Sequence, residues 1–221
     1  MGPGITAFLA DAREFLPILV QGLGLTVLVT VGALVLSTVL GLVWAGLRVS
    51  GVRPAALGAA GVVNLIRGIP IIVQLFFIYF VLPDYGLTFT AVQAAVLGLG
   101  IAYSAYQSEN FRAGIEAIDR GQIEAAASIG MGWWMLMRRV VVPQAVRIVL
   151  PSYGNVLIQL LKDSSQASTI TVAELTLQGR LVASSTFKNT SVFTLVALLY
   201  LAMSIPLILL VGQVERRMRR A

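Results

Sequence analysis

The stretch Phe15–Leu47 reads FLPILVQGLGLTVLVTVGALVLSTVLGLVWAGL and contains no charged residue over its 33 positions. A helix of this length rises about 50 Å, whereas a bilayer core of roughly 30 Å needs only about 20 apolar residues. A second uncharged run, Asn189–Val214, covers 26 residues. These runs predict a membrane protein built from long helices, and they exclude a soluble enzyme.

The whole chain is too poor in charge for a water-exposed surface. Of its 221 residues, 57% are hydrophobic and 12% are charged, whereas soluble domains carry about a quarter charged residues. The chain has no His and no Cys, which excludes thiol chemistry, a Ser-His-Asp triad and the usual zinc sites. Its only lysines, Lys162 and Lys188, do not end a phosphate-binding loop. We therefore expect no enzyme activity and no cofactor or metal bound by this chain.

Five membrane-spanning helices are predicted, at about 16–47, 58–83, 86–108, 142–162 and 189–213, with a cytoplasmic loop at about 109–141. No repeat or linker divides residues 1–221, which indicates a single all-α transmembrane domain. An outside N-terminus and an inside C-terminus place 12 basic residues inside and 4 outside, as the positive-inside rule requires. The pI of about 10.2 then reflects a basic inner face and not a nucleic-acid partner. The tail Glu215–Arg220 is expected to anchor on anionic lipid.

The inner loop contains the stretch Gly121–Gly130, GQIEAAASIG, and reaches VVVP at Val140–Pro143 after nine more residues. This composition predicts two short helices separated at Gly130. Small side chains on the first helix allow close approach of another backbone, so the helix can occupy a partner's groove. The alternative is an ordinary amphipathic loop with its two tryptophans in the interfacial aromatic belt.

The spacing of this loop resembles the coupling loop of binding-protein-dependent ABC importer permeases. The family pattern is E-A-A, three residues, G, nine residues, and an ending of aliphatic-x-aliphatic-P. Five positions here fall on that pattern: Glu124, Ala125, Ala126, Gly130 and Pro143. Gly121 and Gln122, shortly before the E-A-A, resemble the polar amino-acid branch of the family.

Further stretches are similar to the polar amino-acid branch of that family. They are RGIP at Arg67–Pro70, ENFRAGI at Glu109–Ile115 and KDSS at Lys162–Ser165. The chain departs from the branch at Ala113, where the family has Gly, and at Gln166, where it usually has Leu.

The resemblance implies a type I ABC importer permease fold in the bacterial inner membrane. It also implies that the chain lies in the lipid bilayer and has three protein partners. These are a cytoplasmic ABC ATPase dimer that binds ATP and Mg²⁺, a second permease subunit (identical or homologous), and an extracytoplasmic amino-acid-binding protein.

Polar residues within the spans suggest a substrate path. Asn155, Gln159 and Asp163 follow one another at intervals of four and share one helical face, which Ser164 extends. Gln93 on the third span is a facing candidate. The alternative is that the amides only hydrogen-bond helices together. The sequence does not identify the amino acid carried or distinguish a homodimer from a heterodimer.

Arg67 is a charge inside the second predicted span. Only 16 uncharged residues, Gly68–Pro83, separate it from Asp84, which corresponds to about 24 Å of helix. We therefore place Arg67 near the inner interface, as a packing or gating residue beside a kink at Gly68 and Pro70. Two other functions remain open from the residues alone. A self-contained secondary transporter or channel would be expected to have more spans or an inverted repeat, and a scaffold would not need the polar face.

Overall fold

The computed structural model describes residues 3–218, and this part of the chain is helical, with no strand. Residues 1, 2 and 219–221, among them Arg219 and Arg220 of the basic tail, lie outside that range. The α-helices are α1 (Pro3–Gln21), α2 (Leu23–Val49), α3 (Arg53–Gly68), α4 (Ile71–Phe76), α5 (Ala91–Glu116), α6 (Arg120–Ser128), α7 (Trp133–Leu136), α8 (Val142–Asp163), α9 (Leu175–Thr186) and α10 (Asn189–Met218). Two π-helical turns, η1 (Phe77–Val81) and η3 (Met137–Val141), and two 3₁₀ turns, η2 (Leu82–Tyr85) and η4 (Ser164–Ile170), connect them. The all-α prediction is confirmed.

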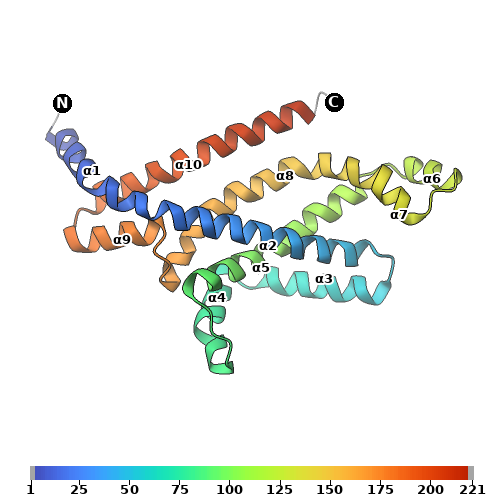
Figure 1. The fold of residues 1–221 in the computed structure, drawn as a ribbon, viewed down its shortest axis with the longest axis horizontal. Coiled ribbons are helices and arrows are strands. Elements are labelled where there is room, and N and C mark those ends of the chain that lie inside the picture. The colour runs from blue at the N-terminus through green and yellow to red at the C-terminus, as the bar shows by residue number, and fades with distance from the viewer. Residues whose placement is uncertain (1–2, 219–221) are drawn as a thin grey trace.

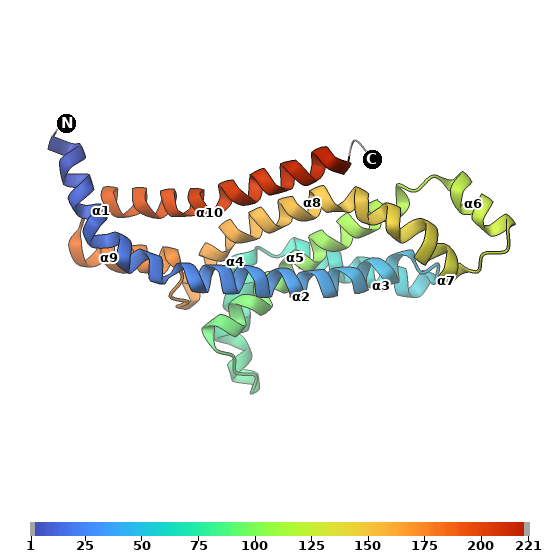
Figure 2. The same cartoon turned by 45° about the horizontal axis from the view of Figure 1, so that its top comes forward.

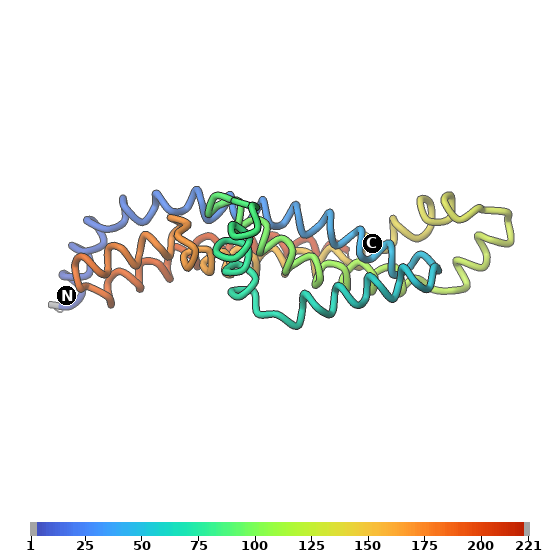
Figure 3. The backbone as a smooth tube through the Cα atoms, turned by 90° about the horizontal axis from the view of Figure 1, so that it is seen from below, coloured from blue at the N-terminus to red at the C-terminus, as the bar shows by residue number. Residues whose placement is uncertain are grey.

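The molecule is elongated, and its long helices run close to the long axis (Figure 1). Helices α6 and α7 form one end, which we call the loop end, and the N-terminus and α9 lie at the opposite end. The segment from α4 to η2 stands away to one side. Figure 3 shows the same separation of the two ends from below.

Three continuous helical segments are long and apolar enough to cross a membrane: Gly4–Val49, Trp133–Ile170 and Asn189–Met218. A fourth crossing is available if the bent pair Arg53–Gly68 and Ile71–Tyr85 counts as one span. Helix α5 has 26 residues but buries polar side chains such as Ser104, Gln107 and Ser108, which lower its hydropathy. The count of five spans and the N-out, C-in orientation stay predictions.

The predicted second span, 58–83, is not one straight helix, because the chain bends by 97° between α3 and α4. Ile69 is extended (φ −104°, ψ 128°), as expected for a residue that precedes a proline. Pro70 has no N–H to continue the helix. The side-chain amide of Gln74 donates to the carbonyls of Ile66 and Ile69, at 2.9 Å each. The kink expected at Gly68 and Pro70 is therefore a sharp bend whose free carbonyls are satisfied locally.

Helix α2 packs along α5 through a row of small residues. Ala33, Ser37, Gly41 and Ala45 follow one another at intervals of four and are all buried. A Cβ atom on Gly41 would lie 2.7 Å from the Cβ of Gln107 and 3.2 Å from backbone atoms of α5. Lipid tails are as apolar as leucine, so helices in a membrane associate through such close packing. We call this row the small-residue seam.

The end of the molecule opposite the loop end is held by Glu174 at the start of α9. Its carboxylate accepts hydrogen bonds from the backbone N–H groups of Thr176 and Leu177, at 2.9 Å each, and from the Tyr200 hydroxyl at 2.8 Å. Burial raises the pKa of the Glu174 carboxyl, and these donors oppose that shift. Nearby, the ammonium of Lys188 pairs with Asp11 of α1 at 2.5 Å, which connects the first helix to the start of the last.

The small-residue seam generates a stability prediction. Gly41→Ala adds a methyl group at the closest approach of α2 and α5, and we expect it to lower the free energy of unfolding by about 1–3 kcal/mol. Gly46→Ala is the matched control on the same helix, because nothing lies within 4 Å of a Cβ atom there. Thermal denaturation of both purified variants in one detergent measures the effect. Equal melting temperatures for the two variants would contradict the claim that close packing at Gly41 stabilises the fold.

Candidate functional site

A cavity of about 370 Å³ opens between the ends of α3 and α4 and the facing sides of α5 and α8. Its polar lining residues are Arg67, Tyr103, Tyr106, Glu109, Asn110, Ser152, Asn155 and Gln159. A volume of this size lies within the usual range for small-molecule sites. The cavity therefore brings side chains from three parts of the sequence to one place.

Helix α8 contributes the amides predicted for the substrate path. Asn155 and Gln159 lie one turn apart on the face that lines the cavity, with Ser152 less than one turn before Asn155. Both amide side chains are exposed to the cavity and make no hydrogen bond to another residue in the described part of the chain. Their donors and acceptors are available to a ligand, and they do not join two helices in this subunit.

A group of charges forms the side of the cavity nearest the loop end. The carboxylate of Glu109 lies 2.8 Å from Arg48 of α2, 3.6 Å from Arg67 of α3 and 2.9 Å from Arg112 of α5. Glu109 and Arg112 are three residues apart on α5, a spacing at which side chains meet on a helix surface. We call these four residues the Glu109 cluster. One carboxylate faces three guanidinium groups, and Arg112 also pairs with Glu116, so three positive and two negative charges leave the region with a net charge of +1.

Arg67 is the member of the cluster that reaches the cavity. Its side chain is 44% exposed, and its guanidinium lies 5.7 Å from the centre of the Tyr106 ring, a cation–π distance. The distance of 3.6 Å to Glu109 is too long for a hydrogen bond. A guanidinium has five N–H donors, so Arg67 can still bind a carboxylate in the cavity.

Asp163 lies beyond the opposite side of the cavity and is held by a tyrosine. The hydroxyl of Tyr103, which lines the cavity, donates to its carboxylate at 2.6 Å. Within residues 3–218, no ion pair joins Asp163 to Lys162. Ser164 is fully buried and donates to the carbonyl of Leu161 at 2.7 Å. Asp163 is therefore one residue removed from the cavity, and Ser164 does not line it.

Gln93, the predicted facing candidate, lies away from the cavity, and so do two other polar side chains, Gln74 and Tyr79. Gln93 is exposed at the start of α5 and forms a capping box with Thr90, so the structure does not bring it into the cavity. Gln74 closes the bend after α3. The hydroxyl of Tyr79 lies 3.3 Å from that of Thr171.

The sequence reasoning missed the contribution of α5 to the cavity. Tyr103, Tyr106, Glu109 and Asn110 follow at intervals of three, three and one, which places them on one helical face. That spacing is the signal that identifies them. It is weak in this chain, because neighbouring polar residues of α5 such as Gln107 and Ser108 face α2 and not the cavity.

The second candidate site is the loop at α6 and α7, which projects beyond the long helices (Figure 2). Asp119 caps the start of α6 by accepting from the backbone N–H of Gly121 at 2.7 Å. Gly130 ends it in the left-handed conformation (φ 80°). The N–H of Gly130 donates to Ala127 and the N–H of Met131 to Ala126, which is a Schellman motif. These caps explain why the loop needs a glycine four residues after Ala126.

One face of α6 packs on the chain, and the other is free. Ala126 is buried with Ile118, Leu136 and Val141, and the amide of Gln144 on α8 donates to the Gln122 side chain at 2.6 Å. The other four residues of α6 that we predicted for the coupling loop are all exposed: Gly121, Gln122, Glu124 and Ala125. The free face can therefore receive a partner while the packed face connects α6 to α8.

A π-helical turn joins this loop to α8. The turn covers Met137–Val141 and directly precedes Pro143, which lies in the first turn of α8 and is exposed. A proline inside a regular helix clashes with the carbonyl four residues earlier, and a π turn is one way to absorb that clash. Despite it, Trp133–Ile170 remains continuous, so the loop and the cavity wall share one helical segment.

Comparison with known proteins shows which family this chain resembles. The family model described as "Binding-protein-dependent transport system inner membrane component" matches residues 37–220. YckA of Bacillus subtilis (strain 168), a probable amino-acid ABC transporter permease protein, is 37% identical over 191 residues, which cover 86% of this chain and 84% of YckA. GlnP of Escherichia coli (strain K12), a glutamine transport system permease protein, is 35% identical over 206 residues, which cover 92% of this chain and 94% of GlnP.

Solved structures agree with these relatives. The crystal structure of an amino acid ABC transporter with histidines has a chain that is 38% identical and superposes with a TM-score of 0.88, covering 95% of this chain and 98% of that one. The inward-facing MetNI methionine ABC transporter shares the fold, with a TM-score of 0.71 at 19% identity. The chain therefore belongs to the family of binding-protein-dependent transport system inner membrane components.

Proposed function

We propose that this chain is the transmembrane subunit of an ATP-driven importer for polar amino acids, and that the cavity between α3, α5 and α8 is part of its translocation path. The chief support is the polar cavity itself: its wall helix α8 lies in the continuous segment Trp133–Ile170, which begins with α7 of the exposed loop. As an inner-membrane component, the chain crosses the membrane several times. ATP and Mg²⁺ bind in separate ATPase subunits.

The loop is the contact with those ATPase subunits. The exposed face of α6, with Glu124 and Ala125, occupies a groove of the ATPase dimer. The packed face passes the motion of the ATPases to α8 through the buried cluster around Ala126 and the contact between Gln122 and Gln144. Helix α8 contains Asn155 and Gln159, so a shift of the loop changes the cavity wall. Gly68 and Pro70 fix the bend beside Arg67 and hold the opposite wall in place.

The cavity chemistry favours a zwitterion with a neutral polar side chain. Arg67 can bind the α-carboxylate, and the oxygens of Asn155 and Gln159 can accept from the ammonium group. The one carboxylate on the cavity wall, Glu109, faces three arginines, and Asp163 lies outside the cavity behind Tyr103, from whose hydroxyl it accepts a hydrogen bond. A cationic side chain therefore finds no free carboxylate. The glutamine permeases among the relatives, GlnM of Bacillus subtilis (strain 168) and GlnP of Escherichia coli (strain K12), support this class of substrate.

Two further partners complete the importer. A second permease subunit packs against the segment from α4 to η2, which stands away from the bundle (Figure 1) and exposes Val73, Phe77 and Phe80. An extracytoplasmic binding protein delivers the amino acid at the end opposite α6. Reconstitution of the four-subunit complex with that binding protein tests the proposal, because uptake into liposomes must require all components and ATP.

The coupling role of α6 is tested by two adjacent alanines. Ala125→Leu enlarges the exposed face and should abolish association with the ATPases and ATP-dependent uptake, while the melting temperature stays unchanged. Ala126→Leu enlarges a buried position and should lower the free energy of unfolding by about 1–3 kcal/mol. Ala117→Leu, exposed on the same loop outside α6, is the control. Normal uptake by the Ala125 variant would refute docking through this face.

The cavity is tested at Gln159. Gln159→Leu removes an amide without filling a packed space, so we expect uptake to fall about fivefold for each lost hydrogen bond of ~1 kcal/mol. Assembly and melting temperature should not change. Gln21→Leu, at an exposed position near the end of α1, is the control. Unchanged uptake kinetics in the Gln159 variant would remove this residue from the path.

The charge preference is tested at the hydrogen bond between Tyr103 and Asp163. Tyr103→Phe removes the donor and frees the Asp163 carboxylate, which can then attract a cationic side chain. The ratio of arginine uptake to glutamine uptake should therefore rise. Tyr106→Phe is the matched control, since that tyrosine lines the same cavity without holding a carboxylate. A ratio unchanged by Tyr103→Phe would show that Asp163 does not set the preference.

A further inference from the structure

The arginines toward the loop end fall into two groups with different surroundings. Arg48, Arg67 and Arg112 all lie within 4 Å of the Glu109 carboxylate. In contrast, no ion pair within residues 3–218 neutralises the exposed arginines of the η3, α8 and α10 surface. These are Arg138, Arg139, Arg147, Arg216 and Arg217.

The packing of α8 on α10 puts two of these arginines at the same depth. The helices run in opposite directions and touch where a Cβ atom on Gly154 would lie 2.5 Å from a methyl group of Val211. Toward the loop end from that contact, Arg147 is seven residues along α8 and Arg217 is six residues along α10. These separations correspond to about 10 Å and 9 Å of helix. Residues far apart in the sequence thus form one basic patch.

The surroundings of this patch are those of a lipid headgroup region. Just before it along α10, Ile208, Leu209 and Leu210 are 49–58% exposed, and on α8 Val146 and Ile148, beside Arg147, are 49% and 46% exposed. The uncharged run Asn189–Val214 has 26 residues, or about 39 Å of helix, which exceeds a hydrocarbon core of roughly 30 Å. Arg216 and Arg217 therefore lie past the core, at the level of phosphate groups.

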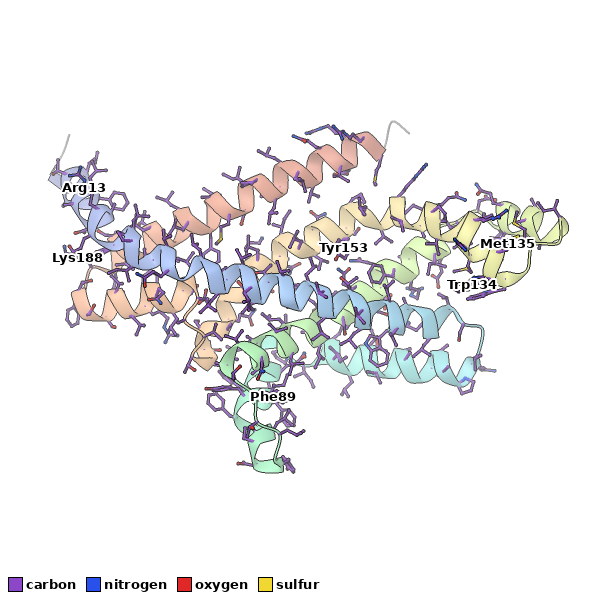
Figure 4. All side chains as sticks on the ribbon, viewed as in Figure 1. Arg13, Phe89, Trp134, Met135, Tyr153 and Lys188 are labelled. Atoms are coloured by element: carbon purple, nitrogen blue, oxygen red, sulfur yellow. The ribbon has the colours of Figure 1, made fainter. Side chains whose placement is uncertain are left out.

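Two tryptophans are exposed on the neighbouring segment, farther toward the loop end than the patch. Trp133 and Trp134 of α7 are 63% and 72% exposed, and their rings lie side by side, 6.3 Å apart. Figure 4 shows Trp134 at the loop end, at the opposite end of the molecule from Arg13 and Lys188. Exposed tryptophans are typical of the membrane–water interface.

We infer that the loop-end surface of α8 and α10 binds the headgroups of anionic phospholipids, through Arg147 and Arg217 with Arg139 and Arg216 beside them. Unpaired guanidinium groups supply charge and directed donors for phosphate oxygens, and the exposed aliphatic side chains accommodate the acyl chains. The nearest carboxylate in sequence, Glu215, leaves the surface with an excess of positive charge. Because α8 also forms the cavity wall and joins the loop, the lipid contacts a segment that moves during transport. The binding itself does not depend on the proposed function.

The test uses the purified full chain, the double variant Arg147→Gln/Arg217→Gln and the matched control Arg13→Gln/Arg180→Gln. Each double variant removes two positive charges, but Arg13 on α1 and Arg180 on α9 are exposed at the other end. Native mass spectrometry after exchange with equal amounts of phosphatidylglycerol and phosphatidylcholine gives the preference for the anionic lipid. We expect at least a tenfold loss of preference in the Arg147/Arg217 variant, at about fivefold for each arginine, and little change in the control.

Three results would overturn the inference. One is an equal loss of preference in both double variants, which would make net charge the cause. Another is displacement of phosphatidylglycerol by millimolar inorganic phosphate, which would indicate a soluble-anion site. The third is loss of ATPase association by the Arg147/Arg217 variant with its lipid preference intact, which would assign the surface to a protein partner. Melting temperatures of all variants in the same detergent establish that each one is folded.

Discussion

Close contact between the backbones of α2 and α5 is the constraint on which the rest of the structure depends. Helices in a bilayer gain little from burying apolar surface against each other, so they must gain van der Waals contact and hydrogen bonds. The seam of Ala33, Ser37, Gly41 and Ala45 supplies that contact. It also fixes the register in which Arg48, at the end of α2, meets Glu109 on α5 at 2.8 Å. A packing requirement in the apolar region thus determines the electrostatics at its edge.

The Glu109 cluster connects the helices to the two candidate sites. It joins α2, α3 and α5 through one carboxylate, and it lies between the cavity and the start of the inner loop. Its excess of guanidinium groups makes this side of the cavity attractive to a carboxylate. At the other side, the hydrogen bond from Tyr103 occupies Asp163. The charge preference that we propose for the cavity therefore depends on how its ionisable groups are paired and not on how many there are.

Much of the site could be predicted from the sequence, and the failures have physical causes. Intervals of four placed Asn155 and Gln159 on one face because α8 is regular there, and the spacing of Glu124, Gly130 and Pro143 identified the loop. The angle of the bend, 97°, could not be predicted, because a proline indicates that a helix breaks but not by what angle. The polarity of Gln93 suggests a place in the cavity, but the residue caps the start of α5. The Thr90 three residues before it is the sequence signal for that capping box. The partner of Asp163 is 60 residues away, and local spacing carries no information on such a contact.

The contact of Gln74 with two carbonyls has a mechanical consequence for the bend after α3. Straightening the bend would draw the Gln74 amide away from the Ile66 carbonyl, and Pro70, four residues after Ile66, has no N–H to donate in its place. Where water is scarce, each unpaired carbonyl costs several kcal/mol. Partly straightened states are therefore unfavourable, and the bend behaves as a rigid corner. In this way α3 and α4 keep a fixed relative orientation, and Arg67 at the bend keeps its position on the cavity wall.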